Sequence, residues 1–302
     1  IPAPSWPSSS PADSPGNPMR VISGDIGGTK TRMALLRVEG ESVEILNEAQ
    51  FPSDRFDSFE EILALFLDGI QTRVNAAAFG IAGPVKGRIG NTTNLPWRID
   101  ADAIVDSFAI PRIELLNDLE ATAWGINALP ESDLVTLNEG ASDARGNGAV
   151  IAAGTGLGEA GLFWSGEGFT PFATEGGHGD FAPRDELECA LLGYLRKRFG
   201  HVSWERVVSG PGLVDIFRFL LEHRRGEISE RILSRMQHEE PAAVIAHEAD
   251  NQENPLCREA MSLFVRLYGA EAGNLALKHM ATGGLFIGGG IAPKILPWLA
   301  TG

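Results

Sequence analysis

Apolar runs and polar breaks follow one another in a regular order along the first part of the chain. Short apolar or alternating runs predict strands at Val21–Ser23, Arg32–Val38, Val43–Gln50, Ala76–Ala82 and Ile113–Leu116. Apolar residues at helical spacing predict helices at Phe59–Ile70, Ala101–Phe108 and Leu119–Ala128. Loops are expected at Gly24–Thr29 and in the Gly/Asn-rich stretch that ends at Pro96. A three-strand meander followed by alternating helices and strands predicts a mixed sheet with helices available for both faces.

A second unit begins near Gly148. Predicted strands at 149–153 and 160–164 flank the loop Gly154–Gly158, so the order of apolar strand, Gly/Thr turn and apolar strand occurs twice, as in a duplicated domain. Most of the remainder predicts helices, at Glu186–Phe199, Leu213–His223, Ile228–Met236 and Pro255–Met280. A last strand at Leu285–Ile287 runs into Gly288–Gly290.

Composition narrows the function classes. The 302 residues suit one large domain or two ordinary ones, with 43% hydrophobic residues, enough for a substantial core. The net charge of −15 makes nucleic acid or an anionic membrane surface an unfavourable main partner, and no apolar run approaches the length of a membrane helix. Two cysteines suit a reducing cytoplasm, which is the predicted location. The Pro/Ser-rich residues 1–18 are expected to be a disordered leader.

Two Gly/Thr turns are candidate phosphate sites. Residues without a β-carbon let backbone N–H groups converge on one anion, which Gly27, Gly28, Thr29 and Lys30 allow in the first turn. Gly154, Thr155 and Gly156 form the equivalent turn of the second unit. For either turn alone, a plain hairpin is an equal alternative. Asp25 favours the phosphate interpretation, because a carboxylate beside bound phosphate needs a bridging cation such as Mg²⁺.

Carboxylates and amides follow the predicted strand at Ile113–Leu116. Asn117 and Asp118 stand at its carboxyl end, where ligands bind in sheets of this class, and an aspartate there can deprotonate a substrate hydroxyl. A helix N-cap is the alternative role for Asp118.

A second polar cluster runs from Glu175 to Asp180. Its glycines hold Glu175 and His178 on a tight loop that suits a sugar or another polyol better than a metal. Glu205 has the pattern of an exposed carboxylate at a helix start, and Gly288, Gly289 and Gly290 suit either a tight turn or close approach to a flat ring.

Taken together, these stretches resemble the bacterial glucokinases of the hexokinase/actin-like ATPase superfamily. The matching stretches, in the family's order, are Gly24–Arg32, Asn117–Ala121, Gly154–Gly158, Glu175–His178, Glu205–Arg206, Ser209–Leu213 and Gly288–Ile291. One such motif is weak evidence, whereas the ordered set is specific.

The resemblance implies an α/β fold with two actin-like (ribonuclease H-like) domains, whose mixed sheets are flanked by helices with a cleft between the domains. The expected limits are 19–128 for the small domain and 129–302 for the large one. It also implies phosphorylation of glucose at the 6-hydroxyl by ATP, with Asp118 as general base.

The resemblance further assigns roles to the candidate residues. Asn117, Asp118, Glu175, His178 and Glu205 would bind glucose. The two Gly/Thr turns would hold the ATP phosphates, Asp25 would lie near Mg²⁺ through water, and Gly288–Gly290 would lie beside the adenosine.

Two departures from the superfamily stand out. The Cys-rich zinc signature of the sugar-kinase and repressor relatives is absent, so no structural zinc is expected. Family members usually continue beyond the position of Gly302 and pack a final helix on the first domain, so this return segment is expected to be missing.

Three alternatives stay open from the sequence: a kinase for another hexose, a polyphosphate-dependent glucokinase, and a sugar-sensing regulator. The regulator is disfavoured because no basic helix-turn-helix segment precedes Met19. The oligomeric state also stays open, with a homodimer among the alternatives.

Overall fold

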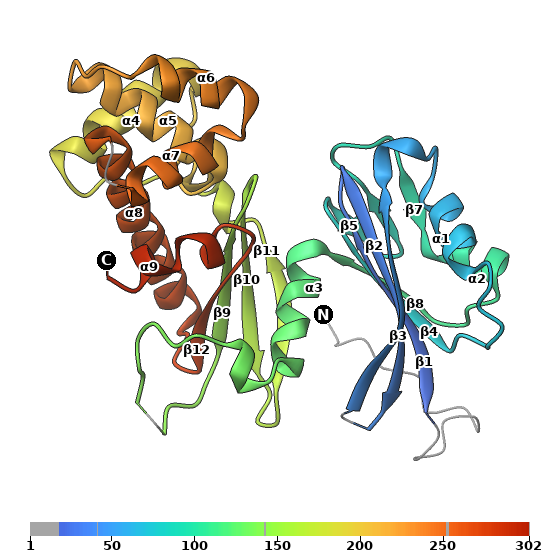
Figure 1. Cartoon of the computed structure of the whole chain (residues 1–302). Helices are drawn as coiled ribbons and strands as arrows, with labels where there is room; N and C mark the ends of the chain where they lie inside the picture. Colours follow the sequence, from blue (N-terminus) through green and yellow to red (C-terminus); the bar gives the residue numbers. More distant parts are fainter. Residues whose placement is uncertain (1–17, 41, 142, 252–253, 302) are drawn as a thin grey trace. The chain divides into compact units, whose positions relative to one another are not determined.

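The computed structural model describes residues 18–40, 42–141, 143–251 and 254–301. The chain divides into two compact units, residues 1–121 and 122–302 (Figure 1). The division falls within helix α3, Asp118–Gly125. The predicted leader at residues 1–18 lies outside the described residues except for Pro18. The predicted domain limits, at 128 and 129, stay a prediction.

The first unit is built on a five-stranded mixed sheet in the order β3-β2-β1-β4-β8. Its strands are β1 (Met19–Ile26), β2 (Lys30–Glu39), β3 (Ser42–Pro52), β4 (Ala76–Ile81) and β8 (Ile113–Asn117). The first three are antiparallel, as the meander predicted, and β4 and β8 run parallel to β1. Helices α1 (Phe59–Leu67) and α2 (Ala101–Phe108) bury their apolar faces in the core of this unit.

The parallel strands of the first unit end at one common edge. Ile26 pairs with Ile81, and Ile81 in turn pairs with Asn117. The turn after β1 and the Asn117-Asp118 pair after β8 therefore leave the sheet at the same level, with β4 between them. Ligands bind at this edge in α/β sheets.

The second unit repeats this arrangement in a four-stranded sheet with the order β11-β10-β9-β12. The strands are β9 (Gly148–Ala153), β10 (Leu157–Trp164), β11 (Phe169–Thr174) and β12 (Gly284–Gly288). Again three antiparallel strands form the meander and the fourth is parallel to the first. Ala152 pairs with Gly288, so the turn after β9 and the triple glycine after β12 leave the sheet side by side. The repeat predicted from the sequence therefore has a counterpart in strand order.

Helices make up most of the rest of the second unit, and the long α8 runs alongside the sheet (Figure 1). The helices are α4 (Glu186–Phe199), α5 (Gly210–His223), α6 (Glu230–His238), α7 (Pro241–Asp250), α8 (Pro255–His279) and α9 (Leu296–Leu299). Single turns of 3-10 helix occur at Ser53–Arg55, Ile126–Ala128, Glu131–Asp133, Gly176–His178, Trp204–Arg206 and Ala292–Ile295. No described helix is both long enough and apolar enough to cross a membrane.

Several predicted boundaries were wrong for local reasons. The loop expected from Gly24 begins only at Gly27, because Gly24 is buried against Phe79 and stays in β1. The first helix ends at Leu67 rather than at the predicted Ile70. Gly69, two residues after Leu67, has a φ of +96°, which is incompatible with a continuing helix. Likewise Leu157 and Gly158, expected in a loop, already belong to β10.

Some elements were not predicted at all. The Gly/Asn-rich loop contains a small antiparallel ribbon of β5 (Val85–Lys86), β6 (Ile89–Asn91) and β7 (Arg98–Asp100). Strand β11 and helix α7 were not predicted either. The start of α7 does have a capping residue, Glu240, whose side chain accepts a hydrogen bond from Ala243 N.

Candidate active site

Asn117 and Asp118 stand at the carboxyl end of β8, at the start of α3. Asn117 occupies the position before the helix, and its Oδ1 accepts a hydrogen bond from Leu119 N at 3.0 Å. Asp118 is the first helical residue, and its Oδ1 accepts from the same N–H at 2.9 Å. The capping position thus falls on Asn117. The alternative role of Asp118 as the helix cap is therefore not needed to account for its place.

The carboxyl group of Asp118 is a better proton acceptor than an ordinary aspartate. Its side chain is exposed at one side, but the surrounding protein withdraws water and raises its pKa above the usual value. The negative charge of Asp25 raises the pKa of Asp118 further, while the hydrogen bonds from Leu119 N and from Asn117 act against the rise. The charges of Asp25 and Asp118 repel each other across this sheet edge, and together they attract a cation to it.

The first Gly/Thr turn follows β1 at this same edge. Gly27 N donates to Lys30 O at 3.0 Å, and Ser53 anchors the turn by donating its hydroxyl to Gly27 O at 2.8 Å. Within the described residues, no protein group accepts from the backbone N–H groups of Gly28 and Thr29. Asp25 is exposed beside the turn and lines a hollow of about 490 Å³ with polar side chains of β2 and β3. The turn has the free amides that a phosphate site requires.

The second Gly/Thr turn joins β9 to β10 in the other unit. Gly154 N donates to Gly156 O at 2.8 Å, while none of the described residues accepts from the N–H groups of Thr155 and Gly156. Gly210 N, at the start of α5, donates to Gly154 O at 2.8 Å. Gly289 lies directly against this turn with a φ of +82°, and a β-carbon there would lie 2.5 Å from Ala153 O. The predicted phosphate and adenosine stretches of this unit are thus neighbours.

Glu205 is tied to the same turn. Its Oε2 accepts a hydrogen bond from Leu157 N at 3.1 Å, and a β-carbon at Gly156 would lie 2.5 Å from that oxygen. The side chain is half-buried rather than exposed, which corrects the expectation from the sequence pattern. Ser209 holds the preceding segment by donating its hydroxyl to Glu205 O at 2.7 Å. The Glu205 carboxylate therefore occupies the space that a side chain at position 156 would take.

The turn that carries Glu175 and His178 lies beside Glu205. Trp204 N donates to Gly179 O at 3.0 Å, and Asp180 forms a β-bridge with Ser203. Both Glu175 and His178 are exposed, and His178 Nε2 lies 3.8 Å from Glu175 Oε2. Acceptors and donors that are exposed and adjacent suit the hydroxyl groups of a sugar.

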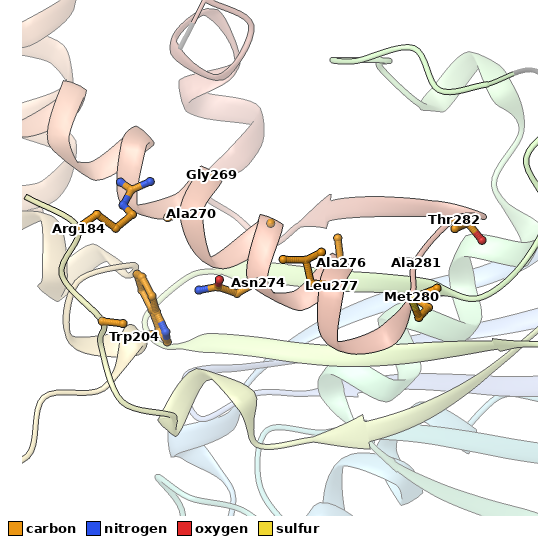
Figure 2. Close-up of a pocket in the computed structure, with 12 residues that line it drawn as sticks. Arg184, Trp204, Gly269, Ala270, Asn274, Ala276, Leu277, Met280, Ala281 and Thr282 are labelled. Atoms are coloured by element: carbon orange, nitrogen blue, oxygen red, sulfur yellow. The ribbon is translucent and has the colours of Figure 1, made fainter.

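The second unit therefore brings together all of its predicted site stretches around the end of β9, and the first unit brings together all of its own at one sheet edge. A different hollow, of about 680 Å³, lies along α8 and is lined among others by Arg184, Trp204 and Asn274 (Figure 2). None of the predicted site residues lines it. Among the described residues, no group of three His, Cys, Asp or Glu side chains could hold a metal ion.

Comparison with known proteins decides the family. A family model described as glucokinase matches residues 22–302. The chain belongs to the glucokinase family.

Individual glucokinases support this membership. A glucokinase of Nostoc sp. is 40% identical over 293 residues, which cover 92% of this chain and 86% of the relative. The crystal structure of a glucokinase from an Antarctic psychrotroph has a TM-score of 0.80 and 31% identity, covering 93% of this chain and 86% of that one.

A ROK family glucokinase from Streptomyces griseus, solved with glucose and AMPPNP, has a TM-score of 0.57 at 21% identity and covers 94% of this chain and 90% of that one. At that identity the likeness concerns the fold alone. The resemblance and the α/β fold class predicted from the sequence are confirmed.

Proposed function

We propose that this glucokinase transfers the γ-phosphoryl group of ATP to the 6-hydroxyl group of glucose. The observation that carries the proposal is the common edge of the first sheet. There the register places Asp118, after β8, level with the amide-rich turn after β1. A proton acceptor and a phosphate-binding turn at one edge are the two groups that phosphoryl transfer to an alcohol requires.

Asp118 would act as the general base. Its carboxylate accepts the proton of the sugar hydroxyl as the oxygen attacks phosphorus, and its raised pKa makes it a stronger acceptor than a free aspartate. The hydrogen bond from Leu119 N to one carboxylate oxygen fixes the orientation of the Asp118 carboxyl group. Asn117, held by its own bonds to Leu119 N and Gly83 O, would bind a neighbouring hydroxyl.

In the second unit, the proposed sugar ligands are Glu175, His178 and Glu205. Glu175 and His178 are exposed on one turn, and the carboxylate of Glu205 is aligned by Leu157 N. A set of fixed donors and acceptors discriminates against sugars that lack a hydroxyl, because a partner would then lose its hydrogen bond. This set favours glucose over an unselective polyol.

The two amide-rich turns would bind the phosphates of ATP, with Gly27–Lys30 in one unit and Gly154–Gly156 in the other, and Gly288–Gly290 would lie beside the adenosine. Asp25 fits a magnesium ion that takes most of its ligands from water and phosphate, because it is an exposed carboxylate two residues before the amide-rich turn. When bound, Mg²⁺ neutralises phosphate charge. Asp25 would orient it through water.

Two finer parts of the proposal concern the setting of the protein. The cysteines are both free thiols, Cys189 exposed and Cys257 buried, which suits a reducing compartment such as the cytoplasm. A homodimer stays a prediction that light scattering would test.

The function is tested by measuring glucose 6-phosphate formation from glucose and ATP, beside other hexoses and beside polyphosphate as donor. We expect turnover with glucose and ATP, and we expect 6-deoxyglucose to inhibit competitively without being phosphorylated. Preferred turnover of another hexose, or of polyphosphate, would support the corresponding alternative. Glucose binding with no turnover by any donor would support the regulator and contradict the proposal.

A further inference from the structure

One carboxylic acid in the second unit is buried against another carboxyl group. Glu159, on β10, is 1% exposed, and neither of its carboxyl oxygens accepts a hydrogen bond from a described residue. Polar groups this deep are almost always paired, because burial of an unpaired group is costly. A buried carboxyl group to which no described residue donates a hydrogen bond therefore calls for an explanation.

A second buried carboxyl group lies close by on α8. Glu271 is fully buried, and its oxygens accept hydrogen bonds from Asn274 Nδ2 at 2.8 Å and from Lys278 Nζ at 3.1 Å. Lys278 is the single cation at this cluster within the described part of the chain, and Glu271 already engages it. If both glutamates were ionised, one negative charge would stay uncompensated inside the protein.

Glu159 lies directly beneath the turn that carries Glu175 and His178. Its carboxyl group occupies the space where a side chain at Gly176 would be, so that any β-carbon at 176 would collide with it. Thr174 also links the two segments. It pairs with Glu159 across the strands, donates its hydroxyl to Glu159 O at 2.8 Å, and accepts from Gly176 N at 3.3 Å. A change at the Glu159 carboxyl group is therefore transmitted to this turn.

The proton of Glu159 is poised near neutral pH. Burial raises its pKa to about 7, the negative charge of Glu271 adds to the rise, and the positive charge of Lys278 opposes it. A hydrogen bond that the protonated acid donates to Glu271 raises the pKa of Glu159 further. Among the other neighbours, Ile151 on β9 and Thr174 on β11 do not titrate. The ionisable groups of the overlying turn, Glu175 and His178, are exposed to solvent, and on α8 His279, next to Lys278, has a lowered pKa.

We propose that Glu159 is a positioning residue for the sugar-binding turn Glu175–His178. As a neutral acid, Glu159 allows Gly176 to pack directly against its carboxyl group. When it loses its proton to solvent, the buried charge displaces the turn and weakens glucose binding. The inference rests on the proposed function, because it takes Glu175 and His178 as sugar ligands.

The test is the pH dependence of glucose affinity between pH 5.5 and 8.5, by calorimetry and from KM. If only the protonated form binds, a pKa of about 7 predicts that the dissociation constant of the natural protein is about twofold higher at pH 7, and about tenfold higher at pH 8, than at pH 5.5. Glu159→Gln, which is neutral at every pH, should lose this rise. Glu167→Gln, an exposed change in the turn after β10, should keep it.

A second variant shifts the transition instead of abolishing it. Glu271→Gln removes the negative charge that raises the pKa of Glu159, so the rise in dissociation constant should begin at lower pH. A purely structural role would not move the midpoint. A pH profile for Glu159→Gln that matches the natural protein would overturn the proposal.

Amide hydrogen exchange of Gly176 and Gly177 tests the positioning role of Glu159 independently of the proposed function, since it needs no sugar and no variant. Exchange at these amides, measured against reference amides of β9, should accelerate above about pH 7 beyond the intrinsic base catalysis. Without such acceleration the positioning role fails, even if glucose is phosphorylated. If exchange accelerates but glucose does not bind at any pH, the proposed function fails while the coupling of Glu159 to the turn stands.

Discussion

Replacing Gly156 with alanine tests how the carboxylate of Glu205 is held. The new β-carbon would lie 2.5 Å from Glu205 Oε2, well inside the usual contact distance, so this oxygen must move by several tenths of an ångström. The oxygen is the acceptor for Leu157 N at 3.1 Å, and the shift breaks or weakens that hydrogen bond. A hydrogen bond to a charged group contributes roughly 1.5–3 kcal/mol.

The expected loss falls on glucose binding more than on stability. A displaced Glu205 would lose its alignment toward the sugar, and a loss of about 2 kcal/mol corresponds to a roughly thirtyfold higher dissociation constant for glucose. Because the side chain is only half-buried, water can replace the lost bond, so the free energy of unfolding should change by less than about 1 kcal/mol.

The control is Gly154→Ala, two residues earlier in the same turn. A β-carbon there has no neighbour within 4 Å, so this variant tests the effect of alanine without the collision. Both variants would be measured by calorimetry with glucose and by thermal unfolding. If Gly156→Ala binds glucose as tightly as Gly154→Ala, then Glu205 is not a sugar ligand held in the way described here.

Two further predictions concern charge. Glu248 is fully buried between two arginines of α6, whose hydrogen bonds lower its pKa. Both arginines reach solvent and can be hydrated when the carboxylate is removed, so Glu248→Ala should cost about 1.5–3 kcal/mol of stability at neutral pH. Glu259→Ala, at a more exposed ion pair, should cost less than about 1 kcal/mol. Since the folded-state pKa of Glu248 lies below its unfolded value, this stabilisation is present above the unfolded pKa and is lost as the pH falls through the folded one. Denaturant melts from pH 3 to 7 should therefore show a larger loss of stability for the natural protein than for Glu248→Ala. Asp25→Asn removes a charge that raises the pKa of Asp118, so a carboxyl ¹³C titration of Asp118 should show a midpoint at lower pH than in the natural protein, and an unchanged midpoint would contradict their coupling.

The sequence was most informative where period and turn chemistry agreed. The helix at Glu186–Phe199 was predicted with both of its ends, because Asp185 caps it and Gly200 ends it. The meander of the first unit was predicted in full, since apolar strands separated by short turns have few other interpretations. In the second unit only β9 and β10 were predicted, and the third strand of the meander, β11, was missed. Short strands such as β5 and β6 were missed because two or three residues cannot display a period.

The candidate site shows a different limit. Asp118 could be predicted from its place after a buried strand, but Glu205 had no local signal and was recovered only through the family resemblance. Its hydrogen bond to Leu157 N depends on tertiary contacts that no local pattern encodes. Glu159 was missed altogether, because a single glutamate in an apolar strand reveals nothing of its partner Glu271 on a helix far along the chain.

The central claim is that the carboxylate of Asp118 removes the proton of the sugar hydroxyl. Asp118→Asn keeps the size and one hydrogen-bonding oxygen of the side chain but not its basicity. We expect kcat with glucose and ATP to fall by about 10²- to 10⁴-fold, while the dissociation constant for glucose changes by less than about tenfold. A variant that turns over glucose at nearly the natural rate would contradict the account.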